Sequence, residues 1–105
     1  MKRRAADPRE DEPQDALAGL AQAIGLLRDP GQVAAFLQDL CTPAELEAMT
    51  DRWRVVPLLL KGVPYREIHD RTLVSVTTIG RVARTLDHGA GGYAAAIERG
   101  ADRVS

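Results

Sequence analysis

The sequence predicts an all-α fold built around a helix-turn-helix pair, and three observations indicate it. Apolar residues recur at spacings of three and four along most of the chain, as they do on one face of an α-helix. Proline, glycine and helix-capping residues separate these stretches. Aromatic residues make up only 4% of a sequence rich in Ala, Leu and Val, which favours helices over sheets. The pattern predicts about six helices in one domain.

Residues 1–14, MKRRAADPREDEPQ, combine prolines and dense mixed charge with almost nothing to bury. This composition is typical of a disordered arm, so we expect the helical domain to cover residues 15–105. Asp15 caps a predicted helix to residue 28, and a second helix follows over residues 32–40 after the break at Asp29-Pro30-Gly31. Both helices are too short to be stable alone, and their apolar stripes need partners.

A longer helix is predicted from Thr42, which caps it, with Pro43 in the first turn and Glu45 completing a capping box. A coiled-coil-like apolar seam follows at spacings of three and four. Its members are Leu46, Met49, Trp53, Val56 and Leu60. Pro57 is expected to kink or split this helix, because its ring clashes with the previous turn. Lys61-Gly62 ends it.

The next two helices are short and joined by a tight turn. The first covers about residues 64–72, with Ile68 directed inward, and the second covers residues 75–87, with Ser75 as its cap. The buried face of the second is predicted to carry Ile79, Val82 or Ala83, and Leu86. A glycine-rich connection over residues 87–93 leads to a last helix over residues 93–103, with Tyr93, Ala96 and Ile97 facing the body.

The second helix of the pair is left with hydrogen-bonding and cationic side chains on its outer face. Thr77 and Thr78 come first, followed by Arg81 and Arg84. A helix entering a DNA major groove needs this order, because its first turn reaches base edges while later residues flank phosphates. Between residues 52 and 86 seven basic residues, Arg66 among them, stand against two acidic ones in a chain of net charge −1. We therefore predict a DNA-binding site made by Arg66, Ser75, Thr77, Thr78, Arg81 and Arg84.

Catalysis, metal binding and membrane insertion find no support in the sequence. His69 and His88 lie far apart, and Cys41 has no second cysteine at zinc-ligand spacing. No apolar run approaches the length needed to span a membrane. One cysteine allows no intramolecular disulfide, which fits a reducing cytoplasm. We expect a cytoplasmic protein that is not an enzyme and that carries no metal and no cofactor.

From about residue 40 to residue 93 the chain resembles the tryptophan repressor superfamily, specifically its short repressor-related branch. The matching stretches are CTPAELEAMTDRWRVVPLLLKG, YREIHDRT and TTIGRVARTLDHGAGGY. The resemblance implies an intertwined, all-helical homodimer in which the N-terminal helices of both subunits share one core. It also implies double-stranded operator DNA as the partner.

In tryptophan-binding members of that superfamily two arginines enclose the indole, and by motif they match Arg52 and Arg81, with Thr42 at the matching helix start. The residue after the second arginine is glycine in those members, whereas this chain has Val82. A valine there would overlap the indole, and overpacking costs on the order of 1–3 kcal/mol. We expect no tryptophan binding, while another small-molecule effector at Thr42, Arg52, Arg81 and Val82 stays open.

A second departure from the superfamily lies in the turn. Relatives usually place glycine where this chain has Leu73. A leucine in the left-handed conformation costs roughly 1–2 kcal/mol, so the sequence predicts either that strain or a reshaped turn. Two functions remain: a dimeric transcriptional regulator, most simply a repressor, and a helical dimerisation module whose helix-turn-helix no longer reads DNA.

Overall fold

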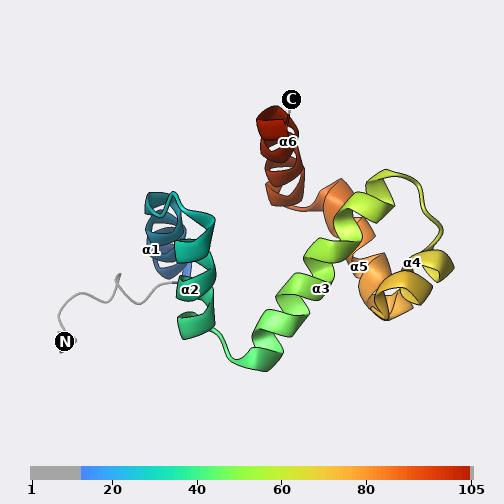
Figure 1. Ribbon diagram of the computed structural model, residues 1–105, viewed down its shortest axis with the longest axis horizontal. Helices are drawn as coiled ribbons and strands as arrows, with labels where there is room; N and C mark the ends of the chain where they lie inside the picture. Colours follow the sequence, from blue (N-terminus) through green and yellow to red (C-terminus); the bar gives the residue numbers. More distant parts are fainter. Residues whose placement is uncertain (1–12, 105) are drawn as a thin grey trace. The chain divides into compact units, whose positions relative to one another are not determined.

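The computed structural model describes residues 13–104, which form six α-helices and no strand (Figure 1). The helices are α1 (Pro13–Leu26), α2 (Pro30–Leu40), α3 (Pro43–Leu60), α4 (Tyr65–Thr72), α5 (Val76–His88) and α6 (Gly92–Val104). They confirm the predicted all-α class and the number of helices. The chain divides into two compact units, residues 1–42 and residues 43–105.

The first unit contributes α1 and α2. α1 begins at Pro13, so the last two residues of the predicted arm are helical, and the rest of that arm lies outside the described residues. Pro30 starts α2, where its fixed φ suits a first turn that needs no N–H. No residue from 15 to 42 is buried, and Leu17 and Leu26 are 67% and 74% exposed. Among the described residues, the two helices therefore display apolar side chains that their own unit does not bury.

The second unit is organised around α3. This helix runs through Pro57 as one element, so the predicted split does not occur. It ends at Leu60, and Gly62 follows in the left-handed region with a φ of 79°. There the Gly62 N–H donates to the Leu59 carbonyl at 3.0 Å and the Val63 N–H to the Leu58 carbonyl at 3.1 Å. This paired hydrogen bonding is the Schellman motif, which satisfies the last carbonyls of a helix.

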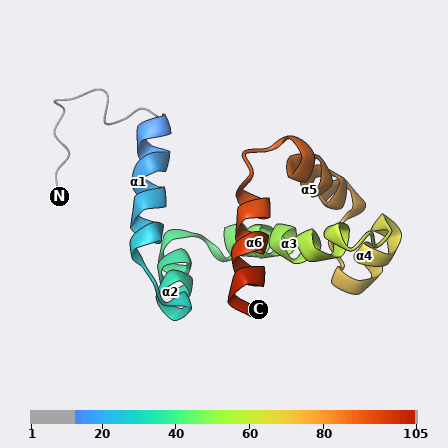
Figure 2. The ribbon, with the colours of Figure 1, turned by 90° about the horizontal axis from the view of Figure 1, so that it is seen from above.

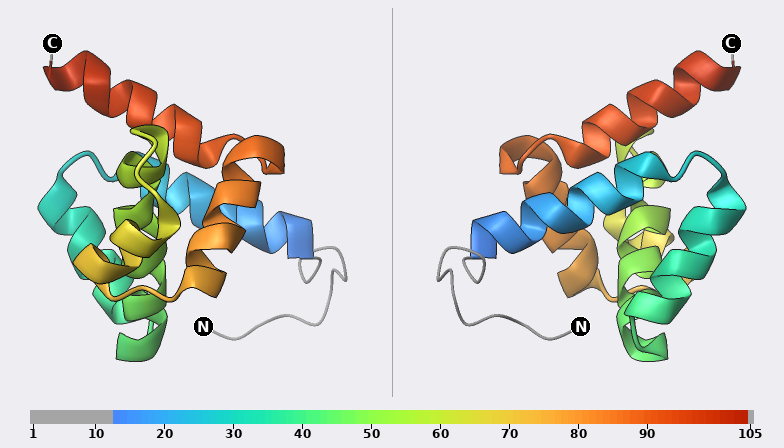
Figure 3. Two further views of the ribbon diagram at one scale, coloured as in Figure 1. Left: turned by 90° about the vertical axis from the view of Figure 1, so that its right-hand side faces the viewer. Right: turned by 90° about the vertical axis from the view of Figure 1, so that its left-hand side faces the viewer.

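A compact aliphatic core joins α3, α4 and α5. Its buried members are Val55, Val56, Ile68, Val74, Ile79 and Val82. Figure 1 shows α4 and α5 together at the C-terminal half of α3, and the same grouping appears in the turned views of Figure 2 and Figure 3. The inward positions predicted for Ile68, Ile79 and Val82 are confirmed. The core thus fixes α5 against α3, which leaves the opposite face of α5 outside.

The predicted seam on α3 divides between the core and the surface. Val56 is fully buried, whereas Met49, Trp53 and Leu60 are exposed. The Trp53 ring lies 6.3 Å from the ring of Tyr93, at the start of α6. Tyr93 and Ile97 pack against the core as predicted, but Ala96 is exposed. An apolar strip therefore remains on the outer side of α3.

Candidate nucleic-acid interface

The turn between α4 and α5 keeps a left-handed residue even though that residue is leucine. Leu73 has φ 64° and ψ 9°, and its N–H donates to the His69 carbonyl at 2.7 Å. Of the two predicted outcomes, strain is therefore the one observed and the turn is not reshaped. His69 Nδ1 lies 2.8 Å from the carbonyl oxygen of Val74. Because a carbonyl only accepts, this contact assigns the ring proton to Nδ1.

A second side chain fixes the same turn. The Thr72 hydroxyl donates to the Ile68 carbonyl at 2.8 Å and accepts from the Val74 N–H at 3.1 Å. Together with His69, Thr72 holds both the N–H and the C=O of Val74, the residue that carries the turn into the core. Sequence reasoning missed these two residues. The sequence offered one indication of this role, for Thr72: a threonine hydroxyl at a helix end often hydrogen-bonds nearby backbone groups.

Ser75 caps α5 as predicted. Its Oγ accepts from the Thr78 N–H at 3.1 Å and donates to the Thr78 hydroxyl at 3.0 Å. The two hydroxyls are thus paired with each other, and Thr78 is half-buried. The Thr78 hydroxyl therefore has a partner within its own helix cap. Thr77 is exposed, and no hydrogen bond is found for its hydroxyl among the described residues.

The cationic side chains on α5 stand opposite its buried face. Arg81 and Arg84 are exposed, and so is Arg66 on α4. Across residues 15–100 none of these three forms an ion pair with an acidic side chain. Arg71, in contrast, is paired with Glu67 at 2.5 Å. The unpaired guanidinium groups are the ones that the sequence assigned to phosphates, and each is available to an external anion.

The predicted effector residues lie on several elements. Arg52 is half-buried on α3, and Arg81 is exposed on α5. Val82 is fully buried and belongs to the same core as Val55 and Val56 of α3. Thr42 falls in the first unit. The valine that replaces the superfamily's glycine thus fills volume between α3 and α5 with core packing.

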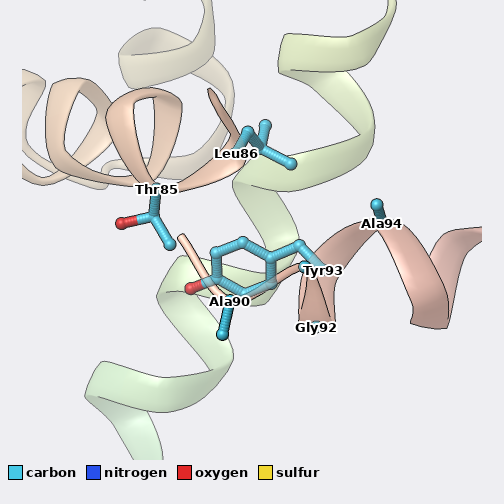
Figure 4. Close-up of a pocket in the computed structure, with 7 residues that line it drawn as sticks. Thr85, Leu86, Ala90, Gly92, Tyr93 and Ala94 are labelled. Atoms are coloured by element: carbon cyan, nitrogen blue, oxygen red, sulfur yellow. The ribbon is translucent and has the colours of Figure 1, made fainter. Parts of the chain in front are cut away.

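Hollows lie on the surface of this unit, and two of them concern the helix pair or its neighbour α6. One, of about 280 Å³, lies where α5 gives way to α6, and Figure 4 shows Thr85 and Leu86 of α5 meeting Tyr93 and Ala94 of α6 around it. None of the predicted effector residues lines it. The other, of about 620 Å³ and open to solvent, is lined by Tyr65, Arg66, His69, Asp70 and Val76. The residues that line this second hollow belong to α4 and to the first turn of α5, so it lies on the helix-turn-helix pair.

The described part of the chain contains no metal-binding cluster and no helix that could span a membrane. No group of three or more His, Cys, Asp or Glu residues is placed to hold a metal ion among these residues. No helix within residues 13–104 is long and apolar enough to cross a membrane.

The six helices, with α4 and α5 closely joined and capped, define an all-helical helix-turn-helix protein. Residues 15–101 match the family model described as Trp repressor protein. The chain belongs to the Trp repressor family, which confirms the resemblance found in its motifs. It is also similar to a protein of Bacillus subtilis (strain 168) described as uncharacterized protein YerC. The two are 35% identical over 80 residues, which cover 76% of this chain and 77% of that relative.

Proposed function

We propose that this chain is a homodimeric, sequence-specific DNA-binding regulator of transcription, with α5 as the helix that enters the major groove. The observation that carries the proposal is the division of α5 into two faces. Ile79 and Val82 fix one face in the core, while Thr77, Arg81 and Arg84 are exposed on the other. A hydroxyl near the helix start can reach base edges, and later guanidinium groups can reach phosphates.

Arg66 extends this surface to α4, as expected for the helix that crosses the DNA backbone in a helix-turn-helix. Membership of the Trp repressor family supports both DNA binding and dimerisation. The exposed leucines of α1 and α2 support a dimer independently, because short helices with uncovered apolar stripes are unstable alone. A dimer would also present two copies of α5 to two half-sites. Repression, by blocking access to promoter DNA, is the simplest mode of action.

We further infer that tryptophan is not the effector of this protein. The indole in tryptophan-binding relatives lies between arginines that match Arg52 of α3 and Arg81 of α5. In this chain Val82 is buried in the core to which both of those helices contribute. A small anion held by Arg52 and Arg81 is compatible with this arrangement, since it needs no room for a ring.

The test is a DNA-binding titration with three arginine and threonine variants. Arg84→Ala should weaken binding to all duplexes equally and reduce the slope of log affinity against log salt by about one unit, through loss of one phosphate contact. Thr77→Ala should instead reduce discrimination between a selected duplex and random DNA. Arg99→Ala, an exposed arginine on α6, is the matched control and should leave both quantities unchanged.

Equal effects of all three substitutions on selected and random DNA would contradict the docking of α5. Binding that is weak, unselective and insensitive to Arg84→Ala would favour the other candidate. That candidate is a helical dimerisation module that keeps the scaffold without reading DNA.

A further inference from the structure

The recognition helix contains a glycine that its own fold does not require. Gly80 lies in the middle of α5, where glycine destabilises a helix relative to alanine. An ideal Cβ built at Gly80 would meet nothing closer than Cε2 of Tyr65, at 3.8 Å, which is ordinary van der Waals contact. Internal packing would therefore accept alanine. The missing side chain leaves helix backbone uncovered by any Cβ beside the ring of Tyr65, and we call the space there the recess.

Two partly exposed side chains, those of Val76 and Tyr65, lie on this side of the helix pair. Val76, one helical turn before Gly80, is 50% exposed, and Tyr65 is similarly exposed. Both residues line the open hollow between α4 and α5. Val76 and Gly80 are four residues apart, so they lie on the same side of α5. A small apolar group entering between them would contact a valine side chain, a ring and bare helix backbone.

The charges around the recess favour a base edge over a phosphate as its occupant. Arg66 and Asp70 both line the hollow, so a cation and an anion face it together. Arg81 follows Gly80 directly on α5 and is exposed. Phosphates are thus attracted to the rim, whereas an uncharged group fits the recess better. The apolar group that a DNA major groove offers to a protein is the C5-methyl of thymine.

We propose that Val76, Gly80 and Tyr65 form a recess that receives a thymine methyl group and gives this protein a preference for thymine at that position of its site. The inference rests on the proposed DNA-binding function and names specificity-determining residues that its motif did not reveal. Thr77, beside Val76, would hydrogen-bond a neighbouring base edge. Gly80 would let the base pair approach the helix more closely than any other residue allows.

The experiment begins with the full-length protein and a pool of random duplexes, from which bound molecules are selected. Each thymine of an enriched duplex is then replaced by deoxyuridine, which removes the C5-methyl group and nothing else. At one position per half-site, uracil should weaken wild-type binding about fourfold, the effect of one buried CH₂ group. Gly80→Ala should fill the recess, weaken binding to the thymine duplex and bring the thymine-to-uracil ratio to about one.

Val76→Thr, which replaces one methyl by a hydroxyl at nearly constant shape, should also lower that ratio. Both variants should fold, because Gly80→Ala favours the helix and Val76 is exposed. Leu73→Gly is the control: it removes an apolar side chain that is 81% exposed but does not line the hollow, and it should leave the ratio unchanged.

The outcomes separate this inference from the function on which it rests. An enriched duplex whose affinity no uracil changes would overturn the recess and leave DNA binding intact. A uracil effect that persists in both Gly80→Ala and Val76→Thr would overturn it in the same way. If no duplex is enriched over the random pool, the proposed function fails and the recess fails with it.

Discussion

The two units of this chain have similar helices but opposite burial. Residues 43–104 enclose a core of six aliphatic side chains contributed by α3, α4, α5 and the turn. In residues 15–42 no side chain is buried, although α1 and α2 carry stripes of the same kind of residue. Helix formation and burial are therefore separate properties. The second unit buries a core within itself but leaves Met49, Trp53 and Leu60 of α3 exposed, while the first unit buries none of its side chains among residues 15–42. In the dimer that we propose, the apolar stripes of the first unit would pack against a second copy.

The largest expected effect concerns that missing surface. Wild-type protein should be a homodimer at micromolar concentration, because burial of each exposed leucine contributes about 1.5–3 kcal/mol. Leu17→Glu combined with Leu26→Glu should produce a monomer, since a buried unpaired carboxylate is strongly unfavourable. Light scattering measures the mass, and circular dichroism should show a loss of helix confined to the fraction that α1 and α2 provide.

The matched control for this prediction is Gln22→Glu combined with Gln38→Glu, which adds the same charge at exposed polar positions of α1 and α2. It should remain a dimer. A wild-type protein that scatters as a monomer and unfolds cooperatively would refute the contrast between the two units.

A smaller effect is expected from the core of the second unit. Ile68→Ala should lower the free energy of unfolding by about 2–5 kcal/mol, since the lost methylene groups leave a cavity that the surrounding helices fill only in part. Val76→Ala, at an exposed position of α5, should change it by no more than about 0.5 kcal/mol. Urea denaturation followed by circular dichroism compares the two. A loss below 1 kcal/mol for Ile68→Ala would show that this core contributes little.

Much of the second unit follows from local sequence rules. Ser75 is a strong N-cap, Gly62 ends α3 in the left-handed conformation, and the period of Ile79 and Val82 gives the buried face of α5. Each depends on residues within one turn of each other, so one sequence suffices to find it. The family resemblance adds the order of the helices, which periodicity alone does not give.

The parts that the sequence missed depend on contacts between elements. The seam on α3 was predicted as one stripe, yet the core takes Val55 and Val56 and leaves Trp53, 43% exposed, outside. Which side of an apolar helix packs inward depends on where α4 and α5 lie, not on α3 itself. The hydrogen bond between the Ser75 and Thr78 hydroxyls was not predicted, because helical periodicity does not describe contacts between side chains. The recess at Gly80 needed the position of a ring from α4.

The smallest expected effect is that tryptophan does not bind, and it tests whether the core of the second unit leaves room for a ligand ring. By the motif match, Arg52 and Arg81 correspond to the arginines that enclose an indole in tryptophan-binding relatives. Val82 is nevertheless buried, in the same core cluster as Val55 and Val56 of α3. Opening this packing for a ring would require core side chains to leave their positions, and guanidinium contacts do not compensate for that. Wild-type protein should therefore bind no tryptophan at physiological concentration.

Calorimetry with L-tryptophan tests this on wild type, Val82→Gly and Val82→Ala, with L-alanine as the control ligand. If Val82→Gly is too unstable to measure, Val82→Ala can be compared with wild type in its place. Alanine removes most of the side chain and keeps a high helix propensity. Micromolar binding by wild type would show that the space between α3 and α5 opens despite Val82. Binding gained only when Val82 is truncated would show that a single core side chain closes an otherwise intact pocket. In that case the same residue that completes the core would also be the one that removed the ligand.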